Sequence, residues 1–159
     1  MASDKGGHLV RRLLVGLMVL SACVPLAFAD NGLVSVKSAH DVKTTANRLE
    51  TSLKEKAMTV FSRVDHAAAG RKVGKQLRPT ELLVFGNPKV GTPLMLCAQT
   101  AGIDLPQKAL IWEDKNGQVW LSYNDPKYLA ERHGITECAE TITKIEDALG
   151  KFAIAATQP

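Results

Sequence analysis

The chain has 159 residues and a formal net charge of +4, a length that suits one ordinary domain. Basic and acidic residues are interleaved along most of it, and the densest basic segment is the short run at 71–78. A run of this size is more often a solvated helix face than a nucleic-acid footprint, so no nucleic-acid partner is expected.

Residues 1–29 have the three parts of a secretory signal peptide. Arg11 and Arg12 form a positive region, an apolar run covers 13–22, and a small-x-small pattern stands at 27–29. The run is shorter than the roughly 20 residues of a permanent membrane span. We therefore expect cleavage after position 29, which would leave Asp30 as the first residue of a periplasmic or secreted protein.

A second processing route is open at residues 20–23. The sequence LSAC has the form of a lipobox, which would lipidate Cys23 and anchor the protein to a membrane. The segment after the cysteine is apolar, whereas lipoproteins usually become polar there, so free secretion is favoured. Membrane contact is expected only for the lipidated form, and both routes lead out of the cytoplasm of a Gram-negative cell.

Hydrophobic periodicity predicts the first elements after the leader. Alternation at 32–37 and again at 58–64 indicates two strands, and helical spacing at 39–56 indicates a long amphipathic helix between them. Asp65 is expected to cap a short helix. The uninterrupted apolar run at 81–85 is typical of an interior strand.

Two dipeptides organise the next part of the chain. Thr92-Pro93 has the form of a helix start, with a cap residue followed by proline at the first helical position. Asn116-Gly117 separates two apolar segments and predicts a hairpin with a type I′ turn. In the register of that turn, the core side of the hairpin would consist of Leu110, Trp112, Val119, Leu121 and Tyr123.

The last elements are a short helix after Asp125, a final helix capped by Thr136, and a frayed tail at 153–159. Residues 30–152 are therefore expected to form a single α+β domain. Its architecture would be a two-layer sandwich, with helices packed on one face of a mainly antiparallel sheet of about five strands.

Several short motifs occur together between residues 65 and 126. They are DHAA at 65–68, FGNPK at 85–89, GTPLM at 91–95, DLP at 104–106, WED at 112–114 and YNDP at 123–126. As a set they resemble the bacterial and archaeal family called domain of unknown function 302, over residues 32–149. The resemblance implies a compact α+β domain that tends to form homodimers, and it implies no activity.

The usual catalytic and cofactor signatures are missing, so no cofactor is expected. Cys97 and Cys138, which lie outside the family pattern, are expected to be two separate buried thiols, and a disulfide between them in an oxidising compartment is the alternative. No metal is expected, because no pair among the soft ligands has tight spacing. Those ligands are His40, Met58, His66, Met95, Cys97 and His133.

Six residues are candidates for one ligand-binding site, because most of them lie at a predicted strand end or helix start inside the family-like motifs. They are His66, Asn87, Thr92, Met95, Tyr123 and Asn124. Helix starts and amides would favour an anionic or carbonyl-bearing ligand. The alternative is that Asn87, Thr92 and Asn124 only cap local backbone.

The preferred hypothesis for function is a non-catalytic exported module that binds a small ligand or a protein partner as a homodimer. An enzyme acting on a small substrate, with His66 and Tyr123 in its site, is the alternative. A metal or redox protein is the third.

Overall fold

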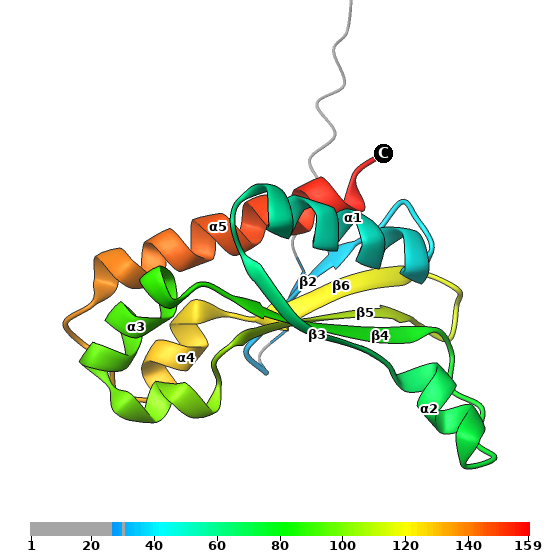
Figure 1. Cartoon of the computed structure of the whole chain (residues 1–159), viewed down its shortest axis with the longest axis horizontal. Coiled ribbons are helices and arrows are strands. Elements are labelled where there is room, and N and C mark those ends of the chain that lie inside the picture. The colour runs from blue at the N-terminus through cyan, green and yellow to red at the C-terminus, as the bar shows by residue number, and fades with distance from the viewer. Residues whose placement is uncertain (1–26, 30) are drawn as a thin grey trace, which may run out of the picture.

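The computed structural model describes residues 27–29 and 31–159 (Figure 1). Its centre is one antiparallel sheet of six strands in the order β1-β2-β6-β5-β4-β3. The strands are β1 (Ala27–Ala29), β2 (Leu33–Lys37), β3 (Thr59–Asp65), β4 (Thr80–Gly86), β5 (Gln107–Glu113) and β6 (Val119–Asn124). The short β1 lies at one edge, in the segment expected to be removed with the leader, and the other five strands form the predicted sheet.

The helices are grouped at three places around this sheet. They are α1 (Val42–Glu55), α2 (His66–Lys72), α3 (Pro88–Cys97), the 3-10 helix η1 (Gln99–Ile103), α4 (Pro126–Arg132) and α5 (Ala139–Thr157). Figure 1 shows α1 and α5 across one face, α3 and α4 gathered at one end, and α2 at the other end. This two-layer α+β arrangement confirms the predicted fold class.

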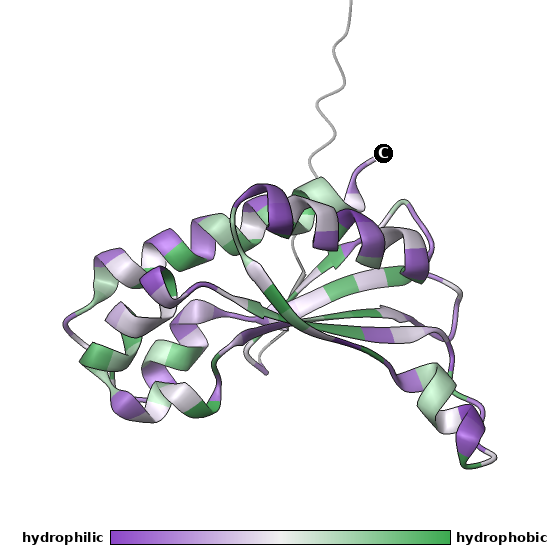
Figure 2. Cartoon of the chain, in the orientation of Figure 1, coloured by the Kyte–Doolittle hydropathy of each residue, from purple (hydrophilic) through white to green (hydrophobic). Residues whose placement is uncertain are grey.

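The hydrophobic core lies between α1, α5 and the sheet. Helix α1 carries Ala46, Leu49 and Leu53 at helical spacing, and these side chains are buried in one cluster with Leu83 and Ile111 of the strands. Figure 2 shows mainly hydrophilic residues on the side of α1 turned away from the sheet. Burial of each leucine contributes roughly 1.5–3 kcal/mol, so this cluster holds the helical layer in place.

The opposite face of the sheet carries a half-buried surface of mixed polarity. The indole nitrogen of Trp112 donates to the hydroxyl of Ser122 at 2.9 Å, and the hydroxyl oxygens of Ser122 and Ser35 lie 2.8 Å apart. These bonds satisfy polar groups on three adjacent strands, β5, β6 and β2, on the face that α1 and α5 leave uncovered.

The hairpin between β5 and β6 has a different register from the one predicted. Trp112 lies opposite Trp120. Gly117 has a φ of 78° and donates to the carbonyl of Asp114 at 3.1 Å, while Asn116 has a negative φ, so the turn is not type I′. Because side chains alternate along a strand, the one-residue shift moves Trp112 from the expected core face to the uncovered face.

The expected frayed tail at 153–159 is also corrected. Helix α5 continues through Thr157, and Ala153 and Ala156 on its inner side are buried. The N–H of Ala39 donates to the carbonyl of Thr157 at 2.9 Å, and Arg48 donates to that of Gln158 at 2.9 Å. The last helical turn is ordered because it packs on the core and its free carbonyls find donors from α1 and the chain before it.

Candidate functional site

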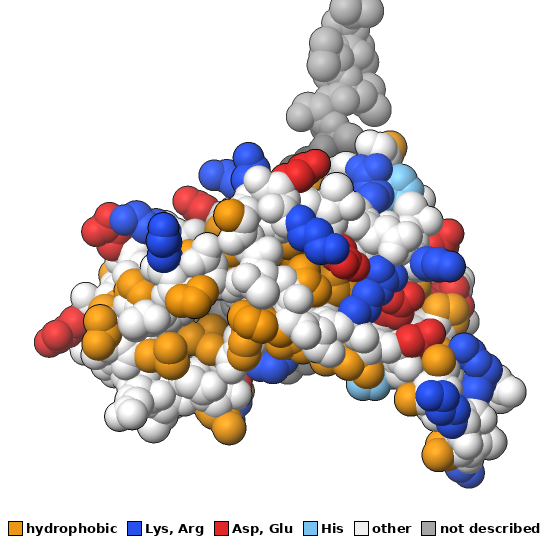
Figure 3. All heavy atoms as spheres, in the orientation of Figure 1, with side chains coloured by type: hydrophobic (Ala, Val, Ile, Leu, Met, Phe, Trp, Pro, Cys, Tyr) orange, Lys and Arg blue, Asp and Glu red, His pale blue; other side chains and the backbone are white. Residues whose placement is uncertain are grey.

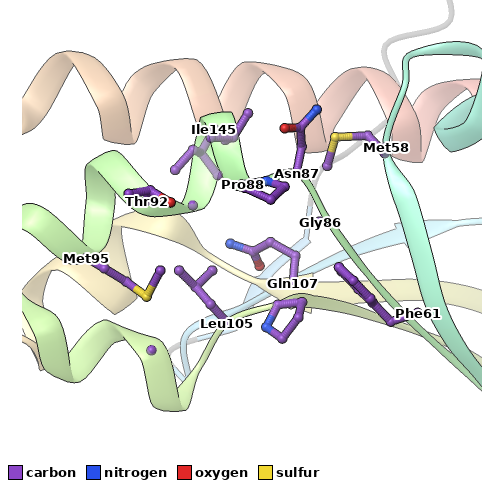
Figure 4. Close-up of a pocket in the computed structure, with 14 residues that line it drawn as sticks. Met58, Phe61, Gly86, Asn87, Pro88, Thr92, Met95, Leu105, Gln107 and Ile145 are labelled. Atoms are coloured by element: carbon purple, nitrogen blue, oxygen red, sulfur yellow. The ribbon is translucent and has the colours of Figure 1, made fainter.

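A cavity of about 250 Å³ opens at the end of the sheet where β4 leads into α3 (Figure 4). Its walls come from the start of β3, the β4–α3 junction, α3, the segment from η1 to β5, and α5. Most of the lining is apolar: Met58, Phe61, Pro88, Val90, Met95, Leu105, Pro106 and Ile145. A cavity of about 150 Å³ accepts benzene, so this one has room for a small organic molecule.

Asn87 holds two walls of the cavity together. Its side-chain oxygen accepts from the N–H of Lys89 at 2.9 Å, which caps α3, and its side-chain nitrogen donates to the carbonyl of Ala57 at 3.1 Å. One amide therefore fixes both the first turn of α3 and the segment that enters β3. Asn87 is therefore a cap, as the alternative interpretation predicted, but its second bond joins segments far apart in the chain.

Helix α3 begins five residues before the expected start. Pro88 occupies the first helical position after the Asn87 cap, and Pro93 lies inside the helix. Asn87-Pro88 is the same cap-and-proline signal as Thr92-Pro93, and the chain uses the earlier one. Thr92 therefore caps nothing: it is exposed at the cavity wall and makes no side-chain hydrogen bond in the part of the chain that the structure describes.

The most buried polar side chain of the cavity is Gln107, which was not among the residues predicted for the site. It lies opposite Phe85 on the helix-covered face, is 7% exposed, and has no hydrogen-bond partner for Nε2 among the described residues. Figure 4 shows its amide among the apolar lining, between Pro88 and Leu105. The available signal was its alternation with Ala109 and Ile111, which places Gln107 on the core face.

Three of the predicted site residues do not reach this cavity. His66 begins α2 beyond the end of β3, and Asn124 pairs with Leu33 at the end of β6. Tyr123 is 5% exposed within the core cluster, where burial, with the charges of Asp125 and Glu146, raises its pKa to about 12. The structure thus brings Asn87, Thr92 and Met95 together and leaves His66, Tyr123 and Asn124 elsewhere.

A disulfide joins Cys97, at the end of α3, to Cys138, just before α5, with Cα atoms 6.5 Å apart. These two helices supply Met95 and Ile145 to the cavity wall. The cross-link therefore restrains the distance between two of the elements that enclose the cavity.

A second polar cluster lies behind the η1 wall. The Nε2 atom of His133 is 2.6 Å from a carboxylate oxygen of Asp104, and its Nδ1 atom is 3.0 Å from the hydroxyl of Thr100. The His133 side chain is 6% exposed, so a buried imidazole joins the end of α4 to η1 and its cap. Within residues 27–29 and 31–159, no group of three or more His, Cys, Asp or Glu side chains could hold a metal ion.

The same described residues contain no helix long and apolar enough to cross a membrane. A crystal structure of an uncharacterized conserved protein DUF302 from Bacillus stearothermophilus has a similar fold. The TM-score is 0.72 at 20% identity, and the match covers 79% of this chain and 98% of that one.

Curated relatives are found in Brucella. Proteins named Fluoride-specific ion channel FluC 1 from Brucella suis biovar 1 (strain 1330) and Brucella abortus biovar 1 (strain 9-941) are each 48% identical over 118 residues. The match covers 74% of this chain but only 46% and 44% of theirs, so the chain spans less than half the length of these relatives. The family model called Domain of unknown function DUF302 matches residues 34–152, and the chain belongs to that family.

Proposed function

We propose that this chain is an exported, non-catalytic module that binds a small, mainly apolar ligand in the cavity between β4, α3 and β5. The observation that carries the proposal is the apolar lining of about 250 Å³ of space. Burial of apolar surface contributes about 25 cal/mol per Å². A ligand that buries about 200 Å² would therefore gain roughly 5 kcal/mol before the costs of association.

The chemistry of the lining supports binding over catalysis. General acid–base chemistry needs a titratable group within hydrogen-bond reach of the reacting atoms. None of the described residues that line the cavity is titratable. His66 and Tyr123, the pair that an enzyme would have used, lie on or beside β3 and β6, and β4 and β5 separate those strands.

Exposed apolar side chains mark the region around the opening. Phe61 is 56% exposed and Val90 is 39% exposed, and both line the cavity. Ile103, next in the chain to the lining residue Gly102, is 74% exposed. Figure 3 shows hydrophobic side chains gathered over this part of the surface. Apolar patches of this kind are typical of ligand or protein contact sites.

A pair of tryptophan substitutions tests the proposal. Met95→Trp would place a larger side chain in the cavity, whereas Leu96→Trp would change the neighbouring residue, which points outward. Small molecules retained by each protein after purification from the periplasm would be extracted and identified by mass spectrometry. We expect a compound that the wild type and Leu96→Trp retain and that Met95→Trp loses. Retention of the same compound by all three proteins, or by none, would contradict the proposal.

The proposal includes an oxidising compartment and a homodimer. The disulfide is the kind of bond that persists outside the cytoplasm, and the leader-like segment before Asp30 agrees with export. N-terminal sequencing of the exported protein should show Asp30 first, and a lipidated Cys23 would establish anchoring instead. Light scattering coupled to size-exclusion chromatography measures the molar mass of the protein in solution. A monomer at all concentrations would contradict the homodimer.

A second candidate function follows from the Brucella relatives, in which the matched sequence is less than half of a protein named a fluoride-specific ion channel. We propose as the alternative that the domain is an accessory module of a membrane transport protein. Fluoride efflux from vesicles containing the Brucella suis relative would be compared with efflux from vesicles containing a variant without the matched 118 residues. Equal rates would remove this candidate.

A further inference from the structure

We infer that Gln107 determines the specificity of the cavity, and that its ligand is an uncharged apolar molecule bearing one carbonyl oxygen that accepts from the Gln107 amide. This inference rests on the proposed function of the same cavity. It begins with one atom, Nε2 of Gln107, which is buried and has no hydrogen-bond partner among the described residues. Buried polar groups without a partner are rare, and a ligand can supply the missing one.

The charge of the ligand follows from the other donors near the cavity. The first helical turn of α3 is not free to bind an anion, because the N–H groups of Val90 and Gly91 already donate to the carbonyl of Asn87, at 2.8 and 3.0 Å. The N–H of Lys89 donates to the Asn87 side chain, and Pro88 has no N–H. No charged side chain lines the cavity in the described structure. An anion would therefore lose its hydration without compensation, which favours a carbonyl-bearing ligand over an anionic one.

Water is a poor substitute for the ligand at this position. A buried water needs two to four polar partners. The amide of Asn87 is already committed to Lys89 and Ala57, and Thr92 is exposed, so the surroundings of Gln107 are almost wholly apolar. A ligand with one acceptor on a hydrocarbon body matches both features, since the body fills the apolar walls and the oxygen reaches the amide.

The size of the cavity limits the body of the ligand. It exceeds the roughly 150 Å³ that holds benzene, and it lies just below the range of about 300 to 1,000 Å³ for drug-sized ligands. Met58 and Met95 flank it on different walls, and their flexible thioethers adapt to the outline of the ligand. An aromatic or aliphatic ketone, ester or amide with about ten heavy atoms fits this description.

Two probes of equal size distinguish the contribution of the carbonyl to affinity from that of the hydrocarbon body. Butyrophenone and 2-phenyl-1-pentene have the same number of heavy atoms and the same branched skeleton, and they differ in that a methylene carbon replaces the carbonyl oxygen. Their dissociation constants would be measured by NMR titration of the methionine methyl signals. We expect the wild type to bind butyrophenone on the order of tenfold more tightly, the effect of one buried hydrogen bond. The side-chain N–H signals of Gln107 should shift with the ketone and not with the hydrocarbon.

Gln107→Leu removes the amide at similar volume, and Gln76→Leu is the matched control at an exposed glutamine beyond α2. In Gln107→Leu the preference should disappear or reverse, and the melting temperature without ligand should rise, because an unpaired buried amide has been removed. Gln76→Leu should bind both probes as the wild type does.

The outcomes distinguish this inference from the proposed function. If the wild type binds both probes equally and the Gln107 signals do not respond, the inference is overturned and the apolar binding site stands. If the wild type binds neither probe, the proposed function falls, and the inference falls with it. The wild-type titration and the Gln107 signals decide the matter even if Gln107→Leu does not fold.

Discussion

Asp114 accepts a hydrogen bond from the indole nitrogen of Trp120, through its Oδ2 atom, at 3.1 Å. Its Oδ1 atom accepts from the backbone N–H groups of Asn116 and Gln118, at 2.8 and 3.0 Å. The bond from Trp120, followed by these two, favours the charged carboxylate and lowers the pKa of Asp114 from its usual 3.8.

The first prediction concerns the Trp120 signal in acid. Because the folded pKa of Asp114 is lowered, the stabilisation is present above about pH 4 and is lost as the pH falls through the folded value. The Nε1–H resonance of Trp120 should therefore titrate with a midpoint below pH 3.8, and Asp114→Asn should abolish the titration. Trp112 is the internal control, because it donates to the neutral hydroxyl of Ser122. Equal movement of both indole signals would contradict the assignment.

The second prediction separates two residues of the same turn. Gly117→Ala should reduce the free energy of unfolding by about 1 to 2 kcal/mol, because it places a side chain at positive φ. An added Cβ at Gly117 meets nothing within 4 Å, so the cost comes from the backbone alone. Asn116→Ala should change stability by less than about 0.5 kcal/mol. Denaturant unfolding measures the stability of both variants. An equal loss of the free energy of unfolding in the two would indicate a type I′ turn instead.

The third prediction uses the buried phenol of Tyr123. Its folded pKa is raised from 10.0 to about 12, so its stabilising contribution is complete below pH 10 and is lost as the pH rises from 10 to 12. The loss is about 2 to 3 kcal/mol. Tyr123→Phe should match the wild type at pH 7 and should be more stable than it at pH 12, as measured by urea unfolding. A constant difference between the two proteins at all pH values would argue against the shift.

The fourth prediction concerns the disulfide. A chain that begins at Asp30 should show no free thiol when it is unfolded without a reductant, although Cys23 would label if the leader were retained. Reduction should lower the free energy of unfolding by about 4 kcal/mol in the chain-entropy model. The double variant Cys97→Ala with Cys138→Ala is the control, because a reductant should not affect it. Labelling of both cysteines in the oxidised chain would show that they are not joined.

Sequence periodicity was sufficient for the order of elements and for the two-layer architecture. The spacing of Ala46, Leu49 and Leu53 specifies the buried side of α1, and the apolar segment around Leu83 specifies an interior strand. Patterns of this kind report burial directly, because a side chain on the wrong face would lose its contribution to the core. The elements predicted from such patterns are therefore present in the folded protein.

The hairpin register and the start of α3 were not predicted, because each depended on one local signal that had a close competitor. Asn116-Gly117 fits both a type I′ turn and a type I turn that ends in a left-handed glycine, and the two differ by one residue in register. Asn87-Pro88 and Thr92-Pro93 are equivalent helix starts. The hairpin register depends on pairing with the neighbouring strands, and the start of α3 is held by the bond from Asn87 to Ala57. A local pattern contains neither contact.

The site was predicted only in part for the same reason. Asn87, Thr92 and Met95 lie within one short stretch of chain, and their proximity follows from that stretch. Gln107 joins them from another strand, and its exposure to the cavity depends on the hairpin register. Tyr123 was assigned to the site because it lies near a strand end inside the family-like motifs, but its side chain is buried in the core cluster.

The disulfide between Cys97 and Cys138 records whether the protein folded under oxidising or reducing conditions. The sheet and its contacts with α1 do not include either cysteine, whereas α3 and α5, which both supply residues to the cavity wall, are joined by them. Two preparations of the same chain, one with and one without a reducing agent, would therefore share the same architecture and differ in ligand affinity. Binding measurements on the oxidised and reduced preparations would therefore report two ligand affinities for one fold.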